Sequence, residues 1–153
     1  MFKSHFIGLA ALLSAAAADP VLAQGFDQGR LQLTHLWVRA TPNAAPTAAG
    51  YLTVTNRGRT ADRLLGGATP EAGAIEPHLM SMTGGIMRMR MASEGFEIGP
   101  GASLTLSPGG SHLMLIGPKH RFNPGDRLPA TLRFAHAGSV KVEFVVATAA
   151  PKP

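Results

Sequence analysis

Histidine and methionine alternate in three short segments of this sequence, and their types and spacing could bind a metal ion. Because successive side chains of a β-strand point to opposite faces, residues spaced by two lie on one face of an extended segment. We therefore expect three strand segments that each present thioether or imidazole donors on one side. The three groups are His78, Met80 and Met82; Met87, Met89 and Met91; and His112 and Met114.

The donor types indicate which metal these segments could hold. Thioethers are polarisable, uncharged donors that favour soft Cu(I), and neutral imidazole also suits copper, whereas hard cations favour oxygen ligands. The sequence contains no cysteine, which excludes disulfides, thiolate zinc and iron–sulfur sites, a Cys-ligated blue-copper centre and thiol catalysis. Because uncharged ligands leave the ion exchangeable, the donors predict a Cu(I) carrier site.

A methionine stripe on one strand face is more often core packing, because methionine fills irregular gaps. That interpretation applies to Met87, Met89 and Met91 when they are taken alone. The alternation of His with Met in three segments favours metal binding. Four methionines are expected to divide between packing and a soft outer shell: Met80, Met82, Met87 and Met91.

The connection between the first two segments determines which donors face each other. A two-residue hairpin turn at Gly84-Gly85, or a four-residue loop over the same stretch, pairs Met82 with Met87 and Met80 with Met89. Both connections place the two donor faces on the same side of the sheet, and a three-residue loop would not.

The segment that begins the motif has an unusual neighbour, because Pro77 directly precedes His78. Proline cannot donate to a β-ladder, so we expect an edge strand or the start of a strand there. In the predicted pairing His78 lies diagonally from Met89, at a distance that long side chains can bridge.

The elements that would position these donors are short alternating runs between Gly, Pro and Asn turn signals. Strands at roughly ten-residue spacing predict an all-β fold, a β-sandwich or barrel. Residues 40–50 are expected to form a long loop. The predicted strands are Leu33–Arg39, Tyr51–Asn56, Asp62–Gly66, Ala74–Met82, Gly85–Met91, Ala102–Ser107, Ser111–Ile116, Leu128–His136 and Ser139–Ala147.

The N-terminus has the pattern of a secretory signal peptide over residues 1–23. Lys3 supplies the positive start, Phe6 to Ala18 is an apolar run, and a small-residue cleavage site precedes Gln24. The run is too short to span a bilayer, so we expect no stable membrane insertion. The rest of the chain is predicted to hold a flexible lead (24–32), one metal-binding β-sandwich domain (33–147) and a disordered tail (148–153).

Composition excludes several other functions. The formal net charge is +5, the positive residues are scattered, and only 6% of residues are aromatic, so a nucleic-acid platform is not supported. Asp62, Glu76 and Glu94 form no paired-carboxylate arrangement and no Ser/His/Asp order stands out, so we expect no enzyme. Trp37 and Tyr51 are expected to pack in the core. Three further histidines lack a companion ligand and are expected to be exposed: His35, His120 and His136.

The stretch from His78 through Met89 to His112-Leu113-Met114 resembles the copper-binding motif of the periplasmic PCu(A)C family of copper chaperones. Ten residues separate His78 from Met89, as in that motif, and twenty-two separate Met89 from His112, one more than is usual. The extra residue leaves Met89 and Met91 as alternative ligands. The resemblance extends from about Leu36 to Val146. It includes the segments Leu36–Pro42, Ala49–Asn56 and Gly109–Leu115.

The resemblance implies a cupredoxin-like Greek-key β-sandwich that carries Cu(I) to the copper centres of a haem–copper respiratory oxidase. The ligands it implies are His78, Met89, His112 and Met114. We expect a monomeric, non-enzymatic periplasmic carrier that hands over copper by ligand exchange. Its partner would be the oxidase copper subunit or another copper-transfer protein. Two alternatives stay open, a periplasmic copper-buffering or tolerance protein and an immunoglobulin-like interaction domain without metal.

Overall fold

The structure, a computed structural model, describes residues 26–28 and 30–152. All of the regular structure in these residues is β-strand, and none of them belongs to a helix that could cross a membrane. The all-β fold predicted from the strand spacing is therefore confirmed. The predicted signal peptide, residues 1–23, lies outside the described residues.

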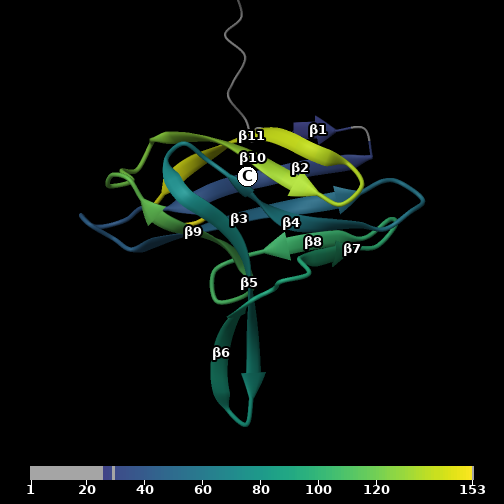
Figure 1. The fold of residues 1–153 in the computed structure, drawn as a ribbon, viewed down its shortest axis with the longest axis horizontal. Coiled ribbons are helices and arrows are strands. Elements are labelled where there is room, and N and C mark those ends of the chain that lie inside the picture. Colours follow the sequence, from purple (N-terminus) through teal and green to yellow (C-terminus); the bar gives the residue numbers. More distant parts are fainter. Residues whose placement is uncertain (1–25, 29, 153) are drawn as a thin grey trace, which may run out of the picture.

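The described residues form eleven strands, which are labelled in Figure 1. They are β1 (Phe26–Gln28), β2 (Leu31–Arg39), β3 (Thr47–Asn56), β4 (Asp62–Ala68), β5 (Ala72–Thr83), β6 (Ile86–Met91), β7 (Phe96–Ile98), β8 (Ser103–Leu106), β9 (His112–Pro118), β10 (Arg127–Phe134) and β11 (Gly138–Ala147).

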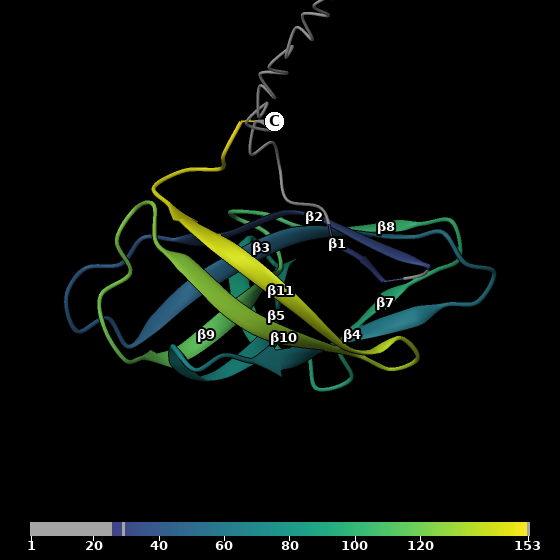
Figure 2. The same cartoon turned by 90° about the horizontal axis from the view of Figure 1, so that it is seen from above.

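Seven of these strands close into a barrel. Their order around the ring is β2–β11–β10–β4–β5–β9–β3, and β3 pairs back to β2. The β11–β2 pair is parallel and the other six ladders of the ring are antiparallel. Figure 2 shows β10 and β11 crossing the barrel at a steep tilt. Closure matters because a closed sheet leaves no unpaired strand edge in the ring.

The barrel interior is filled by the inward-facing residues of alternating strands. On β9, Leu113 and Leu115 are almost completely buried, and they belong to the same hydrophobic core as Phe122 and Phe144. Full burial of an aliphatic or aromatic side chain of this size stabilises a fold by about 1.5–3 kcal/mol. The core therefore fixes β9 firmly, and β9 carries His112 and Met114.

A β-bulge in β2 changes which side chains face the core. Leu31 and Leu33 point inward, but the register with β3 shifts between Thr34 and Trp37, and His35 has φ 54°. Bulges re-aim the residues that follow them. After the bulge Leu36 and Val38 face the core and Trp37 faces the other side of the sheet, where its ring lies 4.6 Å from that of Tyr51.

Strands β5 and β6 form a hairpin arm that projects from the barrel (Figure 1). The first half of β5 pairs with β9 and β4, and from His78 onward β5 pairs with β6. Pro77 lies inside β5, so the expectation of an edge strand or a strand start there is wrong. Its carbonyl accepts from Ala92 N at 2.8 Å, so its ring nitrogen faces the gap between β4 and β6. No ladder donor is needed there, because this is where β5 changes partners.

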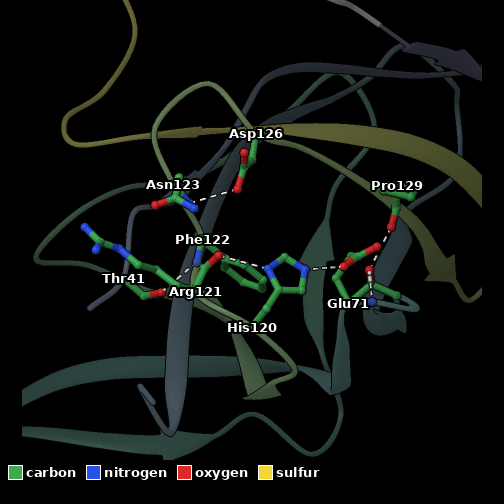
Figure 3. A network of polar contacts seen from close by, with 9 residues as sticks. Thr41, Glu71, His120, Arg121, Phe122, Asn123, Asp126 and Pro129 are labelled. Atoms are coloured by element: carbon green, nitrogen blue, oxygen red, sulfur yellow. Dashed lines mark hydrogen bonds and ion pairs between the residues drawn. The ribbon is translucent and has the colours of Figure 1, made fainter. Parts of the chain in front are cut away.

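The segment that follows β9 is pinned to the barrel by polar contacts (Figure 3). The Phe122 N–H donates to Thr41 Oγ1, and the Thr41 N–H donates to the Phe122 carbonyl, both at 3.0 Å. His120 bonds the Arg121 carbonyl and the Glu71 carboxylate, and these contacts raise the pKa of His120. His120, His35 and His136 are exposed, as predicted.

Most predicted strands match the observed ones with shifted ends, and three predictions differ. Strand β7 was not expected. The loop predicted over residues 40–50 is wrong from Thr47 onward, because β3 begins there and pairs with β9. The flexible lead over residues 24–32 is also wrong in part, because β1 pairs with β2 and Leu31 is buried. Residues 148–152 form no strand, and their disorder stays a prediction.

The turn between β6 and β7 requires glycine. Gly95 has φ 73°, and a Cβ there would lie 2.3 Å from the Leu64 carbonyl oxygen. We expect Gly95→Ala to lower the free energy of unfolding by about 2 kcal/mol, since strained backbone positions cost of order 1–3 kcal/mol. Gly101→Ala is the matched control, because φ is 71° but a Cβ would meet nothing within 4 Å. If urea unfolding shows that both variants lose the same free energy of unfolding, the close approach of Gly95 to the Leu64 carbonyl is not the cause.

Candidate metal centre

Three strands bring the predicted donors to one end of the barrel. In the ladders around β5, His78 lies opposite His112 of β9 on one side and opposite Met91 of β6 on the other. Two positions back on β5, Glu76 lies opposite Met114. Because directly opposed residues share a face of the sheet, these five side chains lie on one face.

The two imidazoles each keep one ring nitrogen available. The rings of His78 and His112 lie 5.9 Å apart between centroids. Gly110 O, which can only accept, lies 3.0 Å from His112 Nδ1, so Nδ1 carries the hydrogen and Nε2 keeps its lone pair. Glu76 Oε2 lies 3.1 Å from His78 Nε2, so His78 presents Nδ1. Such outer contacts fix the tautomer and ring orientation of metal-binding histidines.

His78 Nδ1 is the feature that points most directly to a ligand. It is buried and has no hydrogen-bond partner, alone among the buried side-chain nitrogen and oxygen atoms of the described residues. A buried polar atom without a partner costs about 1–3 kcal/mol. A metal ion between the two rings would satisfy this nitrogen, so the arrangement fits a cation held by imidazole.

One half of the centre is buried in the barrel wall. His112 is 8% exposed and Met114 is 9% exposed. The Tyr51 ring packs edge-on against His112 with centroids 6.4 Å apart, and Trp37 packs on Tyr51. The burial expected for Trp37 and Tyr51 is confirmed, and it does more than fill the core, because Tyr51 packs against the imidazole of His112 and Trp37 backs Tyr51.

The other half is exposed on the hairpin arm. Met89 and Met91 are 50% and 51% exposed, and Met82 and Met87 lie further out. The predicted pairing is confirmed, because Met80 lies opposite Met89 and Met82 opposite Met87. Of the four methionines expected to divide between packing and an outer shell, Met82, Met87 and Met91 are exposed, because the β5–β6 hairpin projects beyond the core. Met80 is half-buried.

The four ligands implied by the resemblance are therefore not equally close. His78 and His112 lie directly opposite each other, whereas Met114 and Met89 are each diagonal to His78, Met114 on β9 and Met89 on β6. Met91 occupies the position opposite His78. Diagonal neighbours remain within reach of long side chains, so Met89 and Met91 can both approach the rings from the exposed side.

Sequence reasoning missed the role of Glu76. Its carboxylate holds the His78 ring, although it belongs to no paired-carboxylate arrangement. The alternation that grouped His78 with Met80 also places Glu76 on the same face, and this signal could have found it. Within the described part of the chain, no three His, Asp or Glu side chains gather to hold a metal by themselves. The thioethers on the same face are the other soft donors beside the two rings.

A closed β-barrel with two oriented imidazoles and a row of thioethers at one end defines a domain suited to a soft metal ion. The chain belongs to the LpqE-like family, whose model matches residues 31–146, and the resemblance to the PCuAC family is confirmed. A relative from Leifsonia xyli subsp. xyli, named "Putative lipoprotein Lxx21020", is 32% identical over 139 residues, which cover 91% of this chain and 80% of that protein.

Solved structures support the same family. The copper-bound PCuAC domain from PmoF2 has a TM-score of 0.67 and 26% identity, covering 84% of this chain and 99% of that domain. The solution structure of CuI-DR1885 from Deinococcus radiodurans has a TM-score of 0.58 and 32% identity, covering 74% of this chain and 75% of that one. The cupredoxin-like fold expected from the resemblance is therefore confirmed.

Proposed function

We propose that this protein is a periplasmic Cu(I) chaperone that delivers copper to the copper centre of a haem–copper respiratory oxidase. The observation that carries the proposal is the pair of imidazoles 5.9 Å apart, each with one nitrogen oriented by an outer contact and the other available. The similar domain from PmoF2 is copper-bound and DR1885 is described with Cu(I), which supports copper as the cargo.

The proposed ligands are His78, Met89, His112 and Met114. His112 and Met114 supply the anchored half of the site, since burial in the barrel wall restricts their motion. His78 completes the imidazole pair, with Glu76 holding its ring. The thioether of Met89 reaches in from the exposed arm. All four donors are uncharged, so they favour soft Cu(I) over Mg²⁺ or Ca²⁺.

Transfer proceeds by ligand exchange without a redox change. The exposed thioether of the arm leaves first, because it is half open to solvent. A Met, His or Cys of the acceptor takes its place while His112 and Met114 retain the ion. The remaining donors then release it as further acceptor ligands enter. The chain itself acts as a carrier and catalyses no bond rearrangement.

The predicted signal peptide over residues 1–23 and the membership of the family support the proposed location and a copper-transfer partner. Export would place the protein where the copper subunit of a respiratory oxidase is accessible. The alternative of an interaction domain without metal depended on the methionines packing in the core, and the exposure of β6 removes that support. Copper buffering differs from delivery only in the fate of the ion.

A strain that lacks the protein tests delivery directly. Oxidase activity should fall when copper is scarce and recover when copper is supplied, because only the delivery step is missing. The wild-type chain should restore activity at low copper and a His112→Ala chain should not. If the strain instead shows normal oxidase activity but increased copper sensitivity, the protein is a buffer and the delivery proposal is wrong.

Leucine substitutions distinguish the two candidate thioethers of β6. We expect Met89→Leu to weaken Cu(I) binding by at least about tenfold, because leucine keeps the apolar volume and removes the sulfur donor. Met91→Leu serves as the matched control, since both side chains are about half exposed, and it should change the affinity by less than about threefold. Competition with a Cu(I) chelator under anaerobic conditions measures both. The reverse order would assign the ligand to Met91.

A further inference from the structure

The outer part of the hairpin arm carries three thioethers that the proposed site does not use: Met80, Met82 and Met87, here called the outer thioether group. We propose that this group binds a second soft monovalent cation, Cu(I) in the cell. The proposal rests on the proposed function and deepens it, because the second ion would lie on the route to the first.

The register of the hairpin brings these sulfurs together. Ala92 N donates to Pro77 O, which makes that pair a hydrogen-bonded position of the β5–β6 ladder. Hydrogen-bonded and non-hydrogen-bonded pairs alternate along an antiparallel ladder, and side chains approach more closely at the latter. Met80 with Met89, and Met82 with Met87, therefore occupy close-approach positions on one face.

Packing does not explain two of these three side chains. Met82 is 68% exposed and Met87 is 50% exposed. In the part of the chain that the structure describes, the exposed large hydrophobic residues all lie on this one hairpin. A group of exposed apolar side chains gathered in one place is typical of a binding site. Exposure also leaves the sulfurs able to receive an ion from solution or from another protein.

The outer part of this face offers donors of a single kind. Residues 79–91 include no Asp, Glu, His or Cys. The hydroxyl groups of Ser81 and Thr83 and the guanidinium groups of Arg88 and Arg90 alternate onto the opposite face. A hard cation would find no carboxylate here. A soft monovalent ion needs only the polarisable sulfurs, and this selects its chemical class.

The outer group is continuous with the proposed copper site. The pair Met80–Met89 directly follows the pair His78–Met91 along the ladder. An ion held by Met80, Met82 and Met87 can exchange onto Met89 and then onto the imidazoles without leaving the face. Each step replaces one thioether by another donor, so charge and oxidation state are conserved throughout.

Titration with Ag(I) tests the proposal, because this ion is soft and monovalent and does not change oxidation state. The methionine methyl signals of the protein are followed by NMR. The first equivalent should shift Met114 and the β6 ligand, and a second equivalent should shift Met80, Met82 and Met87. The double variant Met82→Leu and Met87→Leu should lose the second equivalent and keep the first. Ile86→Leu on the same hairpin is the matched control and should keep both.

The two proposals can fail separately. His112→Ala should lose the first equivalent and retain the shifts of Met82 and Met87, which shows that the outer group binds independently. Saturation after one equivalent, with the Met82 and Met87 signals unmoved, would overturn the second site and leave the copper site intact. A second equivalent that persists in the double variant would overturn the assignment of its ligands.

Discussion

Replacing His112 by alanine should weaken Cu(I) binding by more than about 100-fold. Loss of an outer-contact residue alone typically reduces metal affinity by 10–100-fold, and His112 is proposed to bind the ion itself. Its Nε2 is the available nitrogen of a ring held by Gly110 O at 3.0 Å and walled by Tyr51. Anaerobic titration against a competing Cu(I) chelator measures the loss.

The control for this change is His120→Ala. His120 is exposed, and it bonds Glu71 and the Arg121 carbonyl away from the hairpin arm. Its removal should leave Cu(I) affinity within about twofold of wild type. The circular dichroism of both variants should match wild type, since the barrel core is untouched. Unchanged affinity in folded His112→Ala would refute the proposed ligand set.

Asp62→Ala should lower the free energy of unfolding by about 3 kcal/mol. Asp62 is 6% exposed and its carboxylate accepts three backbone N–H groups, from Arg63 and His136 at 2.8 Å and from Ala137 at 2.9 Å. These bonds tie the start of β4 to the turn between β10 and β11. Alanine leaves these N–H groups without the carboxylate, and hydrogen bonds to charged groups are worth about 1.5–3 kcal/mol.

Chemical denaturation with an Asp126→Ala control measures this effect. Asp126 accepts one exposed N–H, from Asn123 at 2.9 Å, so its loss should cost about 1 kcal/mol or less. Equal losses in the two variants would show that the turn is not held by Asp62. Cu(I) affinity should be unchanged in both folded variants, because neither residue contacts the metal centre.

Asp62 also predicts how stability depends on pH. Burial acts to raise the pKa of Asp62, but the backbone N–H groups of His136, Arg63 and Ala137 together outweigh it and hold the pKa below its ordinary value. The folded state therefore favours the charged carboxylate. This stability is present above the ordinary pKa of 3.8 and is lost as the pH falls through the lower folded value. Asp62→Asn should lack this acid-dependent loss in denaturation measured between neutral and acid pH.

Much of the fold was accessible from local sequence pattern. Period-two alternation between Gly and Pro turns located most of the strands, because inward and outward residues of a half-buried strand differ in polarity. The short connection at Gly84-Gly85 predicted the pairing of Met82 with Met87 correctly. The start of β3 at Thr47 was missed because Thr47–Gly50 gains its order from pairing with β9, far away in the chain.

The side-chain environment of the metal centre depended on contacts between distant segments. The bulge at His35 turned Trp37 away from the core and toward Tyr51, a contact that depends on the pairing of β2 with β3. The change of partner at Pro77 let β5 continue past the barrel as an arm. The methionines of β6 are exposed for that reason, although a row of methionines on one strand face more often packs in a core.

The sequence by itself determined the donor types, their period-two spacing and the hairpin that pairs them, because these follow from chain geometry over a few residues. It therefore indicated a soft-metal site on a β-scaffold. Only the tertiary structure decided which donors are anchored and which are exposed. Strand order around the barrel buries His112 and Met114 between β5 and β3 and leaves the β6 thioethers in solvent. That asymmetry arises from long-range pairing, and it is the property a carrier needs, since one half holds the ion while the other half exchanges it.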